Sequence, residues 1–169
     1  MNKPLKPTDF PMHQVTFGAS DICWIFTGKW RLLDNFAAIP TLYNGITYKT
    51  SEHAFAAAKA ATKQWHDRIA NAPDPNVAKM LGRRCKIRDD WDEIKFQVMY
   101  EIVRSKMRHS APARALLRHT GVRRIYEGNS WHDQVWGVTN HQNLYQPGFT
   151  ATGQNGLGEI LMMVRREIA

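Results

Sequence analysis

The sequence has only two cysteines and lacks any long hydrophobic run. Cys23 and Cys85 lie far apart and form no C-x-x-C pair, which argues against a disulfide framework, and a zinc site would have to consist mainly of histidines. The longest mainly apolar stretches, residues 22–26 and 156–164, are far shorter than the ~20 residues that cross a bilayer. Residues 1–12 contain no apolar segment typical of a secretory signal. We therefore expect a cytoplasmic protein with reduced thiols and no membrane partner.

Signatures of common nucleotide-binding and hydrolytic enzymes are also missing. There is no G-x-x-x-x-G-K-[ST], H-E-x-x-H or G-x-S-x-G motif, and the first absence excludes a P-loop nucleotidase. The glycine-rich residues 153–158 have the wrong spacing for a Rossmann fold. Their N–H groups could face an anion at the start of a helix, or the glycines could serve a tight turn and close packing. The histidines show no metal-ligand spacing, so we expect neither a metal nor a cofactor.

Positive charge is in excess. The sequence has 23 Lys and Arg residues against 15 Asp and Glu residues, which gives a formal net charge of +8. Such a field attracts phosphate-bearing partners and allows contact with nucleic acid, although the charge could equally serve solubility alone. No run of five or more like charges marks a disordered basic tail.

The length of 169 residues fits one domain, and the pattern predicts the α+β class. We expect an N-terminal arm over residues 1–20 and a mostly helical domain over residues 21–169, with a small, mainly antiparallel sheet. Asn44-Gly45 predicts a hairpin over residues 41–48. The other predicted strands are residues 22–26, 122–126 and 134–138, and residues 140–155 are expected as a loop. Helices are predicted over residues 51–64, 75–82, from 89 to about 109, 110–120 and 156–167, from capping residues and hydrophobic spacing.

Two clusters of residues could carry chemistry. Glu52 and Lys59 are seven residues apart on an alanine-rich helix, so the carboxylate and the ammonium share one face, where a ligand could approach closely. The alternative is a solvated pair on a surface helix. The second cluster, residues 126–137, contains carboxylates, a histidine and two tryptophans, which could supply acid–base groups and a stacking wall. Its alternative reading places Trp136 in the core and Asp133 as the cap of a turn.

Taken in order, these residues resemble the NADAR superfamily, also called the riboflavin-intermediate N-glycosidase family. The resemblance extends over residues 22–166. It rests on Asp34-Asn35-Phe36, Tyr48-x-x-Ser51-Glu52-His53-x-Phe55-x-Ala57-x-Lys59, the helix opened by Trp91 that contains Val98-Met99, Glu127, Asp133-x-x-Trp136-Gly137 and Gly153-x-Asn155-x-Leu157-Gly158-x-x-Leu161-Met162-x-x-Arg165.

The resemblance implies an N-glycosidase that hydrolyses the bond between a phosphorylated ribose and a nitrogenous ring. It implies two substrate groups, the ribosylaminopyrimidine phosphates of riboflavin synthesis and ADP-ribose attached to guanine in nucleic acid. The sequence departs from the commoner pattern in Ala58 and Ala60 and in the longer loop over residues 138–152. These departures bear on substrate identity more than on reaction type.

Cleavage of a ribosyl C–N bond builds positive charge on the sugar and requires carboxylates close by. We expect Glu52 and Asp133 to be the catalytic carboxylates, and Lys59 to act as an acid or as a Schiff-base nucleophile. The substrate-binding residues are expected to be Asn35, Phe36, Tyr48, Trp91, Glu127, Trp136, Gly137, Asn155 and Gly158. The alternative function is a non-catalytic module that binds ADP-ribose or nucleic acid. The leaving base, the covalent or direct course of hydrolysis and the oligomeric state stay open.

Overall fold

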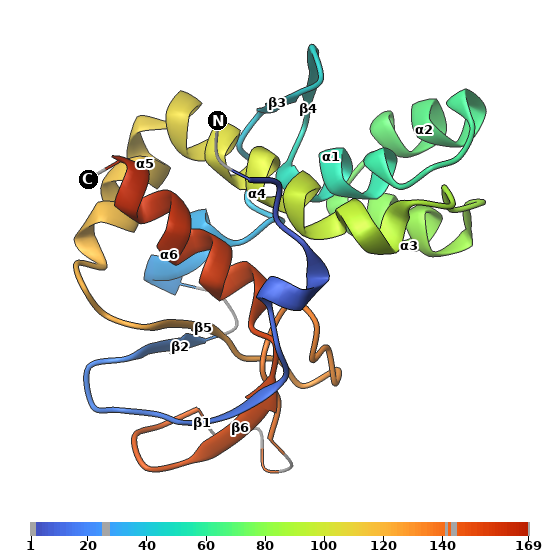
Figure 1. Ribbon diagram of the computed structural model, residues 1–169. Coiled ribbons are helices and arrows are strands. Elements are labelled where there is room, and N and C mark those ends of the chain that lie inside the picture. The colour runs from blue at the N-terminus through green and yellow to red at the C-terminus, as the bar shows by residue number, and fades with distance from the viewer. Residues whose placement is uncertain (1–2, 25–27, 141, 143–144, 169) are drawn as a thin grey trace.

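The computed structural model describes residues 3–24, 28–140, 142 and 145–168 (Figure 1). The helices α1, α2 and α3 gather on the right of Figure 1, strands β1, β2, β5 and β6 lie at the lower left, and α4 crosses the middle. The order along the chain is the 3-10 helix η1 (Pro7–Asp9), β1 (His13–Thr16), β2 (Ile22–Trp24), the 3-10 helix η2 (Gly28–Leu33), β3 (Thr41–Tyr43), β4 (Ile46–Tyr48), α1 (Ser51–Ala58), α2 (Lys63–Ala70), α3 (Pro75–Arg84), α4 (Trp91–His109), α5 (Ala111–His119), β5 (Ile125–Glu127), β6 (Thr150–Gly153) and α6 (Gly156–Ile168). The mostly helical α+β architecture is as predicted.

The helix predicted over residues 51–64 is two helices, and this prediction was wrong about where the first one ends. Residues 59–61 pair with residues 86–88: the Ala61 N–H donates to the Lys86 carbonyl (2.8 Å), and the Arg88 N–H donates to the Lys59 carbonyl (3.0 Å). This backbone pairing draws the chain out of α1 after Ala58. Thr62 then caps α2, because its hydroxyl accepts the Trp65 N–H.

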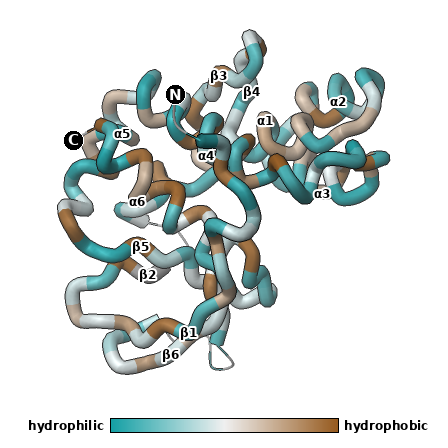
Figure 2. Tube along the Cα trace, viewed as in Figure 1, coloured by the Kyte–Doolittle hydropathy of each residue, from teal (hydrophilic) through white to brown (hydrophobic). Residues whose placement is uncertain are grey.

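The hydrophobic core surrounds α4, which packs against α1, α5 and α6. Phe96, Ile102 and Val103 of α4 are fully buried, as the predicted apolar stripe requires. Lys106 lies on the same buried face, and its ammonium donates to the carbonyls of Leu33 and Asp34. Figure 2 shows that α2 and α3, at the far end from the strands, are mostly hydrophilic. No helix of the described ranges is long and apolar enough to cross a membrane.

The strands form three separate pairs. The hairpin β3–β4 is confirmed, with Asn44 and Gly45 both at positive φ (46° and 77°). β1 pairs antiparallel with β6, whereas β2 pairs in parallel with β5. The strand expected over residues 134–138 is a turn instead, with one isolated bridge between Val138 and Gly128, while β6 lies inside the expected loop. Residues 25 and 26 of the first predicted strand lie outside the described residues.

The N-terminal segment, expected as an arm over the surface, is packed into the domain. Phe10 is 1% exposed and stacks on Phe96 with ring centroids 4.2 Å apart. The Gln154 side chain donates to the Phe10 carbonyl at 2.6 Å, and β1 follows directly. Contacts between residues 86 positions apart (Phe10 and Phe96) and 144 positions apart (Phe10 and Gln154) therefore join this segment to α4 and to the end of β6, and a local reading of the sequence could not find them.

Candidate active site

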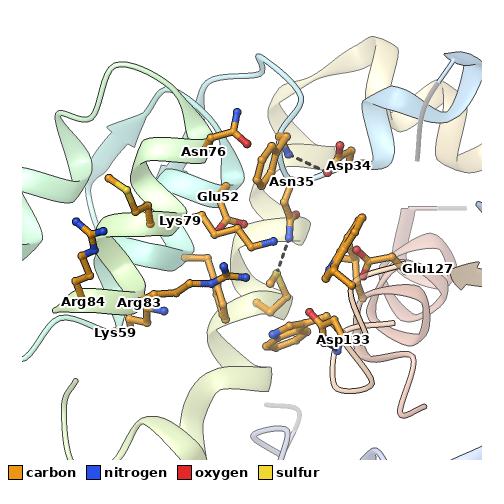
Figure 3. Close-up of a pocket in the computed structure, with 17 residues that line it drawn as sticks. Asp34, Asn35, Glu52, Lys59, Asn76, Lys79, Arg83, Arg84, Glu127 and Asp133 are labelled. Atoms are coloured by element: carbon orange, nitrogen blue, oxygen red, sulfur yellow. Dashed lines mark hydrogen bonds between the residues drawn. The ribbon is translucent and has the colours of Figure 1, made fainter. Parts of the chain in front are cut away.

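A cavity of about 840 Å³ lies between α1, α3 and α4 on one side and the segments 34–36 and 127–136 on the other. Figure 3 shows its polar side chains, with Lys59 and Arg83 at one end, Glu127 and Asp133 at the other, and Glu52 between them. The cavity is therefore polarised, cationic at the α3 end and acidic at the opposite end.

Glu52 enters the cavity from the first turn of α1. The hydroxyl of Thr50 caps this helix by accepting the His53 N–H, and the Glu52 N–H donates to the Asn35 carbonyl at 3.0 Å. Only 9% of Glu52 is exposed. Burial raises the pKa of its carboxyl to about 7, because Lys79 and Lys59 offset only part of the desolvation cost.

Glu127 comes from the end of β5 on the opposite wall. Its backbone is fixed on both sides, since its N–H donates to the Asn155 side chain (3.0 Å) and its carbonyl accepts the Val138 N–H (2.8 Å). Its Oε2 atom is buried and has no hydrogen-bond partner among the described residues. Burial, followed by the negative charges of Asp133 and Asp34, raises the pKa of Glu127 to about 8. Both carboxyl groups therefore titrate near neutral pH rather than near 4.5.

Lys59 ends α1 and lies on the same wall as Glu52, as the seven-residue spacing predicted. Its side chain passes over Gly82 of α3, where a Cβ atom would lie 2.9 Å from the Lys59 Cε. Partial burial lowers the pKa of the Lys59 amine, while Cys85 and Glu52 partly oppose this shift. The neutral amine, which is the nucleophilic form, is thereby favoured more than in a solvated lysine.

Four other predicted site residues also line the cavity: Asn35, Phe36, Asp133 and Trp136. Asn35 has a buried side-chain oxygen without a hydrogen-bond partner in the described chain. The Asp133 Oδ1 atom accepts the N–H groups of Val135 (3.0 Å) and Trp136 (2.9 Å), so this carboxylate also caps the turn. The Trp136 ring packs against Phe55 and Phe96 with centroids 5.1 and 5.0 Å away. Trp136 therefore packs against the core and Asp133 caps the turn, as the alternative interpretation had it, and both residues also line the cavity.

Two aromatic residues expected to bind substrate lie outside the cavity lining. The Tyr48 hydroxyl is hydrogen-bonded to His66 at 2.8 Å. Trp91 is 8% exposed and packs on Phe55. Both were predicted to contact the ligand because of their position in the motif. In the structure, Tyr48 joins the hairpin to α2, and Trp91 packs α4 against α1.

The other three predicted binding residues, Gly137, Asn155 and Gly158, have structural roles. The Asn155 amide accepts the Glu127 N–H and donates to the Ile125 carbonyl. A Cβ atom at Gly137 or Gly158 would lie 2.3 Å from a backbone oxygen of β5, so these glycines permit close packing. The first N–H groups of α6 donate to the Val135 and Trp136 carbonyls (3.0 and 2.9 Å) and are not free for an anion. The packing interpretation of the glycine-rich segment is the one that fits.

Several polar or large lining residues were not among the predicted site residues, although Asp34 stands in the motif and Trp131 in the second cluster. They are Asp34, Asn76, Lys79, Met80, Arg83, Arg84 and Trp131. The signal was present on α3, where Asn76, Lys79 and Arg83 follow helical spacing on one face. In the described parts of the chain, no group of three or more His, Cys, Asp and Glu residues could hold a metal ion.

Comparison with known proteins defines the class. The solved NMR structure of the Escherichia coli protein YbiA matches with a TM-score of 0.72 at 30% identity, covering 90% of this chain and 86% of that one. The fold is therefore that of a YbiA-like α+β protein. The model of the NADAR domain matches residues 25–169. The chain belongs to the NADAR domain family, as its sequence motifs predicted.

Curated relatives carry glycosidase and riboflavin names. N-glycosidase YbiA of Escherichia coli is 36% identical over 137 residues, which cover 80% of this chain and 79% of that protein. An N-glycosidase of Nostoc punctiforme is 38% identical over 102 residues, or 59% of each chain. A riboflavin biosynthesis protein of Vibrio vulnificus is 33% identical over 138 residues, which cover 80% of this chain and 35% of that protein. Two of these three relatives are thus named N-glycosidases, and the third is named for riboflavin biosynthesis.

The raised pKa of Glu127 makes the folding stability depend on pH. Because the pKa is about 8 in the folded state and ordinarily 4.5, the folded state holds the proton more tightly, and stability falls as pH rises between these values. Glu127→Gln removes this titration. We expect the free energy of unfolding of the variant, relative to wild type, to increase from pH 5 to pH 8 by up to ~1.4 kcal/mol per pH unit.

Urea unfolding at a series of pH values measures this difference. The exposed Glu93 of α4 supplies the control, and Glu93→Gln should show little change with pH. A stability difference between Glu127→Gln and wild type that stays constant from pH 5 to pH 8 would show that the Glu127 carboxyl titrates normally.

Proposed function

We propose that this protein hydrolyses the N-glycosidic bond between a phosphorylated ribose and a nitrogenous ring. One observation carries the proposal: two carboxyl groups, Glu52 and Glu127, face one cavity with pKa values of about 7 and 8, together with a partly buried lysine. Such groups can give and take protons at neutral pH. The N-glycosidase names of the relatives support the same reaction type.

The departing ring nitrogen needs a proton, and the developing positive charge on the sugar needs a carboxylate. Glu127 has the higher pKa and remains protonated in neutral solution, so it is the proton donor to the leaving nitrogen. Glu52, which feels the charges of Lys79 and Lys59, is the carboxylate that faces the sugar. Asp133 was expected to be catalytic. One of its oxygens accepts two backbone N–H groups, so we assign it to stabilising the turn.

Lys59 is the nucleophile in this proposal. Its neutral amine forms a bond to the anomeric carbon as the C–N bond to the ring breaks, and the ring leaves with the proton from Glu127. The attached amine then passes a proton to Glu52, and Glu52 gives it to the ring oxygen of the sugar as the bond between that oxygen and the anomeric carbon breaks, which leaves a protonated imine between Lys59 and the opened sugar. Water adds to the imine carbon and the carbon–nitrogen bond to Lys59 breaks, which releases the sugar phosphate as its aldehyde, restores the amine and returns a proton to Glu127. The lowered pKa of Lys59 supports this role over that of a fixed ammonium.

The substrate is either a ribosylaminopyrimidine phosphate or ADP-ribose on guanine. The riboflavin biosynthesis name of one relative supports the first. The net charge of +8 is compatible with the second, which would bring nucleic acid to the cavity. Incubation with each compound, followed by chromatography of the released base, distinguishes them. Release of neither base, together with measurable binding of ADP-ribose, would favour the non-catalytic binding module instead.

Glu52→Gln should retain the fold and lose about 10²- to 10⁴-fold in turnover, because the amide keeps the shape of the side chain and removes its charge and proton. Release of base under single-turnover conditions measures the loss, and circular dichroism checks the fold. Glu93→Gln, which alters an exposed carboxylate on α4, should turn over normally. Turnover of Glu52→Gln close to that of wild type would remove Glu52 from the mechanism.

Lys59→Ala should abolish turnover because the covalent step is lost. Borohydride added during turnover should reduce the imine and attach a sugar-derived mass to wild type, which mass spectrometry of the intact protein detects. Lys63→Ala is the matched control, since the Lys63 side chain is 87% exposed, and it should form the adduct as wild type does. An inactive Lys59→Ala combined with an unmodified wild type would assign Lys59 to proton transfer, and an active Lys59→Ala would exclude it from the site.

A further inference from the structure

Two cations of α3 face the cavity and have no part in the bond-breaking steps. Lys79 and Arg83 are four residues apart, so they lie on one face of the helix. Figure 3 shows both side chains directed toward the middle of the cavity, whereas Arg84, which also lines the cavity, lies farther out at its edge. Glu127 and Asp133 lie at the opposite end.

These two cations are not held by partners in the protein. Within the described ranges, neither side chain forms an ion pair or a hydrogen bond with another residue. The Lys79 ammonium instead lies 5.4 Å from the centre of the Phe36 ring and 5.5 Å from that of Trp131. Cations of other helices do pair with carboxylates: the exposed Lys63 pairs with Asp67, and the half-buried Lys95 pairs with Asp92.

A need to neutralise the charge of Glu52 does not explain why Lys79 and Arg83 face the cavity. A carboxylate that served as their partner would lie within 4 Å, as in a salt bridge, and within the described residues neither cation forms such an ion pair with Glu52. Lys79 and Arg83 lower the pKa of Glu52, but burial outweighs them and leaves that pKa raised to about 7. Helix stability explains only part of the pattern, because cations favour the last turn of α3, which contains Arg83 and Arg84 but not Lys79.

We propose that Lys79 and Arg83 bind the phosphate group of the substrate, an assignment that rests on the proposed function. Arginine and lysine are suited to this ligand, the first through its forked donors and the second as a point charge. Asp34 and Asp133 would repel a phosphate at the opposite wall. The phosphate therefore lies at the α3 end, the sugar carbon lies beside Glu52 and Lys59, and the ring points toward Glu127.

Calorimetric titration with ribose 5-phosphate, and with ribose as the uncharged comparison, tests the assignment without requiring turnover. Wild type should bind ribose 5-phosphate more tightly than ribose. Arg83→Gln and Lys79→Gln should each weaken ribose 5-phosphate binding by about 10- to 100-fold, the range for loss of a charge-assisted hydrogen bond. Lys86→Gln makes the same change in charge at an exposed side chain outside the cavity lining, three residues along the chain from Arg83, and should change the affinity by less than about threefold, as a screened surface charge does.

Equal weakening of binding by Arg83→Gln and Lys86→Gln would mean that the effect comes from general charge and would refute the subsite. Unchanged binding in both Lys79→Gln and Arg83→Gln would refute it as well. If Arg83→Gln is unstable, Arg83→Lys keeps the charge and should retain most of the affinity. The two proposals fail separately. Wild type that releases no base but shows this binding pattern keeps the phosphate subsite and refutes the glycosidase. If wild type releases base but neither substitution changes the affinity for ribose 5-phosphate, the glycosidase proposal stands and the phosphate subsite is refuted.

Discussion

The burial of carboxyl groups without an ion-pair partner is the constraint on which the site depends. Glu52 and Glu127 stand on facing walls of one cavity, and neither forms an ion pair within the described residues. Desolvation of each carboxylate opposes folding at neutral pH, so the surrounding structure must hold both side chains in place. The cap at Thr50 does this for α1, and the Asn155 amide does it for β5. Chemistry at neutral pH is thus gained at the expense of stability.

Local signals predicted much of the fold. Asn44-Gly45 gave the hairpin, and Asp74 and Ser110 mark the starts of α3 and α5, because the conformations of short turns and helix caps depend on neighbouring residues. The pairing of β1 with β6 and the burial of Phe10 escaped prediction, because their partners are more than 80 residues away. The end of α1 was missed because it depends on pairing with residues 86–88, which lie 25 to 29 positions further along the chain than their partners at 61 and 59.

The site was predicted in part. Motif position and helical spacing correctly brought Glu52, Lys59 and Glu127 to one cavity. The same reasoning could not separate residues that touch the cavity from those that support it, so Asn155 was expected to hold the ligand when it holds Glu127. In a sequence, a charged helix face such as that of α3 cannot be told from a solvent-exposed face, because the segments that form the opposite wall of the cavity are distant in the chain.

The central claim is that two carboxyl groups of the cavity titrate near neutral pH, so that Glu127 can give a proton and Glu52 can accept one. Carbon-13 NMR of the side-chain carboxyls as a function of pH measures this directly, with the resonances assigned from spectra of glutamine variants. The account predicts that Glu52 titrates near 7 and Glu127 near 8, both far above the ordinary value of 4.5. Titration of both groups near 4.5 would contradict it, since neither would then hold a proton for the leaving ring.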